Sequence, residues 1–423
     1  MVTEIAAAKI TSAPPLDLLT RLRLSILMLL QFAVWGAWFV VFFPYLINNN
    51  FTPAQAGSLI GNMALGAILS TMVAGYVADR YFSSQNLMGV LHLLGAGLLA
   101  LMAQYQSPDQ YWPLFAASLA YALLYNPTLA LANSIAFTHV PDATRDFPGI
   151  RVLGTVGWIA AGVSLGYLFG EEATKGNGPL LLAAALSAVL GVYSFTLPKT
   201  PPLGRAGDAI PFVKALGLFR DPSFAVFFLV SFGITIVLAF YYTTTGAFLE
   251  SGAKVPGDRI GSTMAIGQVA ELILLPFLPL FLYRLGMKWV LALGMFCWGL
   301  RYLLFAFGGP EGLAFALVIV GVALHGICFD FFFAAGFIHV DNQAPRDIRA
   351  SGQALFSFLT YGVGMWLGNL TAGYLQGVYT DSSGTVNWQQ FWLVPSIGVL
   401  VALVIFVLFF RLQPAPATTT TES

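Results

Sequence analysis

Long apolar segments recur along the whole chain and are separated by short polar loops. A helix needs about 20 largely apolar residues to cross the hydrocarbon core of a bilayer. Because lipid cannot satisfy backbone polar groups, such segments are predicted to be helices. Twelve segments qualify as membrane spans: 24–47, 56–78, 86–104, 112–137, 150–170, 179–197, 223–249, 260–283, 288–307, 311–338, 351–377 and 390–411.

Composition agrees with a chain whose surroundings are lipid. Hydrophobic residues make up 58% of the chain and charged residues 9%, whereas soluble domains carry roughly 25% charged residues. The formal net charge is zero, which gives no reason to expect nucleic acid as a partner. The two cysteines show no metal-ligand spacing, so we expect no metal or other cofactor.

The loops predict how the chain is divided and oriented. The longest loop, 198–222, is rich in proline and charge and separates six spans from six. Of the 19 Lys and Arg residues, only Lys175, Lys254 and Arg259 fall in the outer loops of a topology with both termini in the cytoplasm. The predicted parts are an N-terminal tail (1–23), a six-helix bundle (24–197), a linker (198–222), a second six-helix bundle (223–411) and a C-terminal tail (412–423).

An internal repeat supports this division. The stretch "TRDFPGIRVLG" (144–154) joins the fourth and fifth spans, and "PRDIRASGQ" (345–353) joins the tenth and eleventh. Both carry Arg-Asp followed by Ile-Arg at equivalent places. We therefore predict an all-α membrane protein with 12 transmembrane helices in two pseudo-symmetric halves. This is the major facilitator architecture, whose binding site lies near the midplane between the halves.

Ionisable residues inside the spans are the first functional candidates, because charge is costly in lipid. Glu271 has Gln268 three residues earlier, so the two side chains share one helix face. A carboxylate and an amide together suit a neutral polyhydroxylated or heterocyclic ligand. The alternative is a buried hydrogen-bonded pair that fastens this helix to a neighbour.

Asp330 lies in the apolar run "HGICFDFFFAAGF" (325–337). Removal from water favours the neutral form of a carboxyl group, so Asp330 is a candidate proton carrier, and His325 could cooperate with it. Arg301, 13 residues beyond Lys288, lies about 20 Å into the membrane. We expect it to form a structural ion pair with Glu271 or Asp330, with a role in coupling as the alternative. A permanent Arg301–Asp330 pair would leave no titrating carboxylate there.

A polar and aromatic stripe is predicted at the start of the fifth span. Arg151, Thr155 and Trp158 are spaced i, i+4 and i+7, which presents a cation, a hydroxyl and an aromatic ring on one face. Alternatively, Arg151 is an interfacial residue of the kind that sets membrane orientation.

Other aromatic residues are weaker candidates for a cavity lining. Trp35 follows Gln31 by one helical turn in the first span. Tyr241 and Tyr242 lie in the seventh. Both places combine the apolar surface of an aromatic ring with a hydrogen-bonding group.

Five motifs make the chain resemble a known family, the bacterial nucleoside:proton symporters, which are nucleoside permeases of the major facilitator superfamily. The resemblance runs from about residue 24 to residue 411. Its marks are "LQFAVWGAWF" (30–39), "DFPGIRVLGTVGW" (146–158), "GQVAEL" (267–272), "LRYLLFAFG" (300–308) and "FDFF" (329–332).

The resemblance implies nucleoside import across the inner membrane by alternating access, driven by the proton gradient and without a cofactor. It implies nucleosides, protons and the bilayer as partners, and we expect a monomer. Family positions for binding and proton coupling fall on Arg151, Thr155, Trp158, Gln268, Glu271, Phe329 and Asp330.

The chain departs from the family pattern at three positions. His325 replaces a tyrosine and is kept as a candidate substrate contact, while Ala239 and Tyr242 replace a glutamine and an asparagine. Losing two amides leaves the base preference open, so a transporter of sugars or other polar metabolites, or an exporter, is the alternative function. An enzyme is not expected, because neither Gly-x-Ser-x-Gly nor His-Glu-x-x-His occurs.

Overall fold

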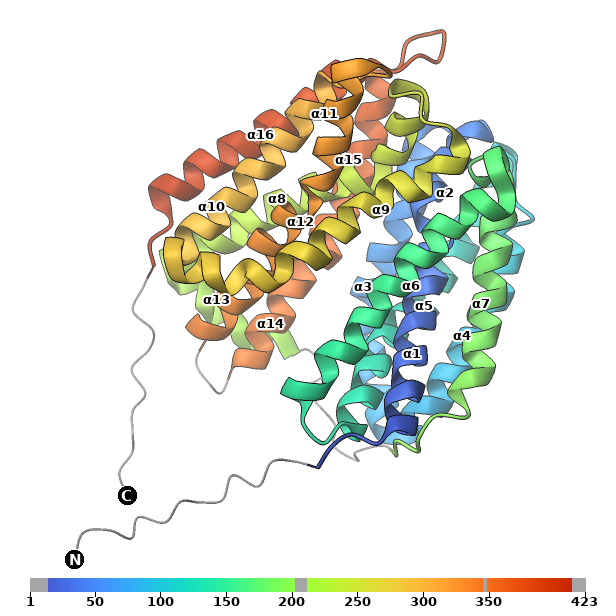
Figure 1. Cartoon of the computed structure of the whole chain (residues 1–423), viewed down its shortest axis with the longest axis vertical. Coiled ribbons are helices and arrows are strands. Elements are labelled where there is room, and N and C mark those ends of the chain that lie inside the picture. The colour runs from blue at the N-terminus through green and yellow to red at the C-terminus, as the bar shows by residue number, and fades with distance from the viewer. Residues whose placement is uncertain (1–13, 202–210, 345–347, 413–423) are drawn as a thin grey trace, which may run out of the picture.

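A computed structural model shows the chain as an assembly of α-helices (Figure 1) and describes residues 14–201, 211–344 and 348–412. Within these ranges no strand is formed, and one isolated bridge joins Thr380 to Val386. The prediction of an all-helical chain is confirmed.

Several predicted features lie partly outside the described residues. They include most of both terminal tails, the central part of the linker and the Pro-Arg-Asp that begins the second copy of the internal repeat. The described helices follow the order of the predicted apolar segments. Those of the first part are α1 (Leu18–Gly36), α2 (Phe39–Asn48), α3 (Pro53–Tyr81), α4 (Ser84–Met102), α5 (Tyr111–His139), α6 (Ala143–Phe169) and α7 (Gly178–Ser194).

The second part of the chain has more and shorter elements, because π-helical segments interrupt several helices. The α-helices are α8 (Pro222–Ala247), α9 (Gly257–Leu274), α10 (Leu278–Ala306), α11 (Gly312–Ala323), α12 (His325–Phe329), α13 (Ala335–Gln343), α14 (Arg349–Ser357), α15 (Met365–Val378) and α16 (Trp388–Phe409). The π-helical segments are η4 (Phe248–Gly252), η6 (Asp330–Ala334) and η7 (Phe358–Gly364).

Helix starts follow local sequence signals. A capping box begins α3, because the Thr52 side chain accepts from the backbone of Gln55 and the Gln55 side chain accepts from the backbone of Thr52. Asp221 caps α8, and Pro222 occupies its first position, where no backbone donor is required. Because these signals involve only neighbouring residues, the sequence alone marks where both helices begin.

Eight helical segments among the described residues are long and apolar enough to cross a membrane. Helix α7 has 17 residues and falls short of that length. Helix α10 begins within the predicted eighth span and continues through the ninth, with Gly286 in a non-helical conformation (φ 75°, ψ 163°) between them. The number twelve therefore stays a prediction, whereas several membrane crossings are supported.

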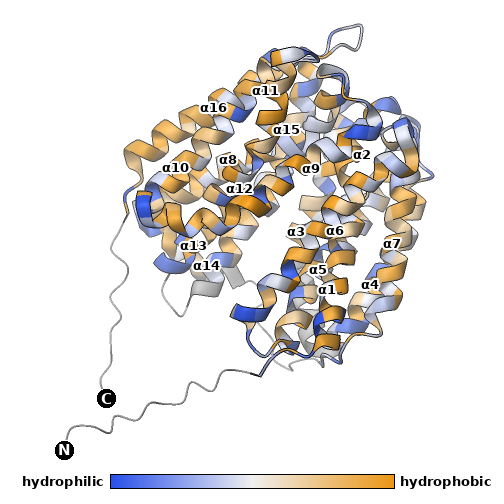
Figure 2. Ribbon diagram, viewed as in Figure 1, coloured by the Kyte–Doolittle hydropathy of each residue, from blue (hydrophilic) through white to orange (hydrophobic). Residues whose placement is uncertain are grey.

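Figure 1 shows α1–α7 on the right of the molecule and α8–α16 on the left, with α9 beside α6. The pairs α6–α9 and α3–α15 bring helices of the first part of the chain into contact with helices of the second part. Hydrophilic residues gather toward the helix ends, and apolar residues cover much of the helix lengths (Figure 2). This distribution fits helices that cross a bilayer.

Glycines let α6 and α9 approach closely at one end of their contact. A Cβ atom added to Gly261 would lie 2.1 Å from the carbonyl oxygen of Gly162, and one added to Gly166 would lie 1.9 Å from that of Asp258. Small residues allow such backbone contact between membrane helices. The same region is tied by Glu250, which accepts hydrogen bonds from the Thr174 hydroxyl (2.7 Å) and the Asn48 amide (3.2 Å).

Candidate functional site

Polar and aromatic side chains form a cluster where α8, α9 and α12 meet. The Nε2 atom of His325 lies 3.2 Å from the Tyr242 hydroxyl and 4.0 Å from Oε2 of Glu271. The Tyr241 ring stacks on the imidazole, with centroids 4.8 Å apart and planes inclined by 15°. His325 is fully buried, whereas 23% of the Glu271 side chain is exposed. A partly exposed glutamate and a buried imidazole are thus close enough to interact.

Arg301 also contacts the face of the Tyr241 ring. Its guanidinium carbon is 4.0 Å from the Tyr241 centroid and 4.9 Å from that of Trp298. Its Nε atom donates to the carbonyl oxygen of Gly321 at 3.0 Å, and both Nη atoms lack a hydrogen-bond partner. Aromatic faces attract the buried cation through their quadrupoles. Arg301 and His325 therefore both pack against the Tyr241 ring.

The predicted ion pair of Arg301 is not formed. No carboxylate among the described residues lies within ion-pair distance of Arg301, so neither Glu271 nor Asp330 is its partner. The guanidinium instead contacts the Tyr241 ring of α8, the Trp298 ring of its own helix α10 and the Gly321 carbonyl group of α11, which stand in for a carboxylate.

We expect Arg301→Lys to lower the stability of the protein by about 1–2 kcal/mol. Lysine keeps the charge but lacks the planar group that covers both rings and reaches the Gly321 carbonyl. Thermal unfolding in detergent measures the effect, with Arg259→Lys at an exposed position as the matched control. An unchanged unfolding temperature would show that these contacts contribute nothing.

Asp330 begins the π-helical segment η6 and is 1% exposed. Its Oδ2 atom has no hydrogen-bond partner. Phe329, directly before it, is half-buried, and its ring centroid lies 5.7 Å from that of His325. An ionised carboxylate in such a place is costly unless it is paired or takes up a proton.

The predicted stripe on α6 lies against α1. The Arg151 guanidinium carbon is 4.1 Å from the Phe32 ring centroid, a contact that no spacing within α6 could have predicted. The Trp158 ring meets Trp35 edge-on, with centroids 5.1 Å apart.

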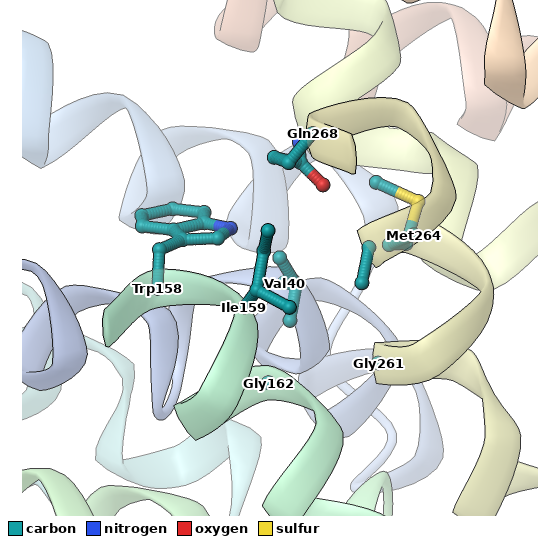
Figure 3. Close-up of a pocket in the computed structure, with 8 residues that line it drawn as sticks. Val40, Trp158, Ile159, Gly162, Gly261, Met264 and Gln268 are labelled. Atoms are coloured by element: carbon teal, nitrogen blue, oxygen red, sulfur yellow. The ribbon is translucent and has the colours of Figure 1, made fainter. Parts of the chain in front are cut away.

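A narrow pocket lies between α2, α6 and α9. Trp158 and Ile159 from α6 and Gln268 and Met264 from α9 point into the same space (Figure 3). In this conformation the space between these side chains is too small to hold even a water molecule, far below the roughly 300–1,000 Å³ of typical ligand pockets. The complete lining is Val40, Trp158, Ile159, Gly162, Gly261, Met264, Ala265 and Gln268.

The structure brings only part of the predicted site into this pocket. Trp158 and Gln268 line it, and the Gln268 Oε1 atom has no partner. The remaining predicted residues lie outside this lining: Arg151, Thr155, Glu271, His325, Phe329, Asp330 and Arg301.

Sequence analysis missed several residues that line the pocket. Met264 and Gly261 precede Gln268 by four and seven residues. Helical periodicity, extended back from Gln268, would have found both of them on the same face.

A model of the nucleoside H+ symporter family matches residues 18–415. The chain belongs to the nucleoside H+ symporter family. It is 38% identical to the transporter YegT of Escherichia coli (strain K12), over 93% of this chain and 94% of YegT.

Two further comparisons agree with this family. The xanthosine permease of Escherichia coli (strain K12) is 32% identical, over 93% of this chain and 97% of the permease. The crystal structure of the nucleoside transporter NupG matches with a TM-score of 0.85 at 29% identity, covering 93% of this chain and 100% of that chain. A member of the nucleoside H+ symporter family is a multi-pass membrane transporter and not an enzyme, as the sequence predicted.

Proposed function

We propose that this symporter imports nucleosides across the cytoplasmic membrane, driven by the proton gradient and without a cofactor. One observation carries the proposal: α9 joins the pocket to the titratable cluster. Gln268 lines the pocket, and Glu271, three residues later, faces His325. Movement of this helix would change the surroundings of a substrate contact and a proton-binding group together.

In the proposed binding mode, the nucleobase stacks on Trp158, and the free Gln268 Oε1 accepts from a base N–H or a ribose hydroxyl. Trp158 already contacts Trp35 and Phe39 by ring edges, with centroid distances of 5.1 and 6.2 Å. Its position is therefore held before substrate arrives. Arg151, Thr155, His325 and Phe329 complete the site once the narrow pocket widens.

Glu271 and Asp330 are the proposed proton carriers. Glu271 combines a partly exposed side chain with proximity to His325, and Asp330 has a buried, unpartnered oxygen. Loading a proton on either group removes a charge from low-dielectric surroundings, which favours the conformational change that exposes the site inward. Arg301 is proposed to stabilise the cluster through the Tyr241 ring.

The proposal includes alternating access between two six-helix halves, residues 24–197 and 223–411, joined by the linker 198–222. The proposal also includes twelve membrane spans, both termini in the cytoplasm and a monomeric transporter. Its support is the internal Arg-Asp repeat and the distribution of Lys and Arg residues. The α6–α9 contact joins one proposed half to the other.

We expect Trp158→Ala to raise the KM for nucleoside uptake about tenfold, because stacking on an aromatic ring contributes about 1–3 kcal/mol per base. Initial uptake rates over a range of nucleoside concentrations give KM. Trp112→Ala, at a tryptophan that is 71% exposed, is the matched control and leaves KM unchanged. Equal KM values for the two variants would contradict the stacking role.

The function is tested by uptake into proteoliposomes with an imposed inward proton gradient. We expect labelled uridine, adenosine or xanthosine to accumulate, and the accumulation to stop when a protonophore collapses the gradient. Accumulation of sugars alone would favour the alternative substrate class that the replacements at Ala239 and Tyr242 raised. Efflux of preloaded nucleoside against its gradient would indicate an exporter.

A further inference from the structure

A chain of buried polar side chains links α1, α4, α5 and α7, away from the residues assigned to substrate and protons. The Gln31 Nε2 atom donates to the Thr128 hydroxyl at 2.8 Å, and Gln31 Oε1 lies 2.9 Å from Nε2 of His92. The other His92 ring nitrogen, Nδ1, lies 3.1 Å from the Ser187 hydroxyl. At most 2% of any of these four residues is exposed.

Hydrogen-bond directions follow from the donors available. The Thr128 hydroxyl gives its only proton to the Tyr125 carbonyl oxygen at 2.6 Å, so toward Gln31 it can only accept. The Gln31 amide group must then present Nε2 to Thr128 and Oε1 to His92. Since Oε1 is an acceptor, His92 carries its proton on Nε2. The single hydroxyl proton of Ser187 lies between two acceptors, the His92 backbone carbonyl oxygen at 2.9 Å and Nδ1 at 3.1 Å. The orientation of the Gln31 amide group and the tautomer of His92 are thus linked.

Gln31 lies one helical turn before Trp35, close to the point where the first span breaks. Helix α1 ends at Gly36 and α2 begins at Phe39. The Tyr125 hydroxyl donates to the backbone carbonyl of Gln31 at 2.7 Å. The end of α1 is therefore tied to α5 through both the backbone and the side chain of one residue.

Trp35 connects the end of α1 to the proposed substrate pocket. Its ring meets Tyr125 and Trp158 edge-on, at centroid distances of 6.1 and 5.1 Å. Trp158 lines the pocket. A rotation of the end of α1 would move Trp35 and remove the support on which the Trp158 ring rests.

We propose that His92 is a positioning residue of the transport site: through Gln31 it holds the end of α1, and thereby keeps Trp35 against Trp158. The proposal rests on the proposed function of Trp158 in nucleoside binding. His92 contacts no substrate in this account. His92 bonds to Gln31, and Gln31 bonds to Thr128 on α5. Trp35, one helical turn after Gln31, contacts the Trp158 ring.

Two matched substitutions separate positioning from packing. In His92→Gln the amide nitrogen reaches about as far as the imidazole Nε2 and still donates to Gln31. In His92→Asn the shorter amide reaches only toward Ser187. We expect His92→Gln to keep a wild-type KM for nucleoside and His92→Asn to raise KM about tenfold, with the maximal rate per folded molecule changed less. Thr128→Val, which keeps side-chain volume but removes the acceptor for Gln31, is expected to act like His92→Asn.

A double-mutant cycle and a structure complete the test. In a Trp158→Ala background, His92→Asn is expected to have no further effect on KM, because the two act on one contact. A structure of His92→Asn, which needs no substrate, should show the Trp35 ring displaced from Trp158. The proposal is overturned if His92→Gln and His92→Asn raise KM equally, or if Trp35 stays in place. Absence of nucleoside uptake by the wild type would refute the proposed function, while the Trp35 position would still decide this inference.

Discussion

Replacing Glu271 by glutamine is expected to abolish nucleoside accumulation driven by a pH gradient. Glutamine has the shape of a protonated glutamate but cannot release a proton, so the variant cannot return to the ionised state that the coupled cycle needs. Exchange of labelled for unlabelled nucleoside needs no net proton movement. We therefore expect Glu271→Gln to retain exchange within about tenfold of the wild type, the range expected when one hydrogen bond is altered.

The measurement compares the two reactions in the same proteoliposomes. Glu172→Gln makes the same chemical change at an exposed acid and serves as the control, with both reactions preserved. Gradient-driven accumulation by Glu271→Gln would show that Glu271 is not the coupling group. Loss of exchange as well as accumulation would show that its carboxylate is needed for binding itself.

Replacing Gly261 by valine is expected to reduce uptake about tenfold, by preventing α6 and α9 from closing against each other. A Cβ atom at this position would lie 2.1 Å from the Gly162 carbonyl oxygen, which belongs to the backbone and cannot turn away. Overpacking of this kind costs about 1–3 kcal/mol. Because the clash occurs only where α6 and α9 are in contact, it raises the free energy of that conformation. The population of the transporter therefore shifts toward states in which the two helices are separated.

Spin labels at Tyr167 on α6 and Ser262 on α9, both exposed, report the separation of the helices. We expect the distance between the labels to increase in Gly261→Val. Gly97→Val is the control, because a Cβ atom at Gly97 meets nothing within 4 Å. An unchanged distance together with normal uptake would show that this contact does not open and close during transport.

Periodicity predicted the parts of the site that lie on single helices. Gln268 and Trp158 line the pocket, whereas Glu271, three residues after Gln268, lies outside this lining and beside His325. Spacing along one helix can be predicted because i, i+3 and i+4 neighbours are set by helix geometry alone.

Contacts between helices could not be predicted in the same way. The depth of Arg301 followed from its distance along the chain, but its direction around α10 did not, and the guanidinium faces Tyr241 and Trp298 instead of an acid. The π-helical segment that begins at Asp330 adds a second reason. A π-helical turn changes the register of the residues that follow it, and no sequence pattern used here indicates one.

The coupling of protons to nucleoside movement is tested most directly by a pH-sensitive dye enclosed in proteoliposomes that hold the wild-type symporter. With no gradient imposed, external uridine should acidify the lumen as it enters, and Asp330→Asn and Glu271→Gln should abolish this acidification. Uridine entry without any change in the pH of the lumen would contradict the account.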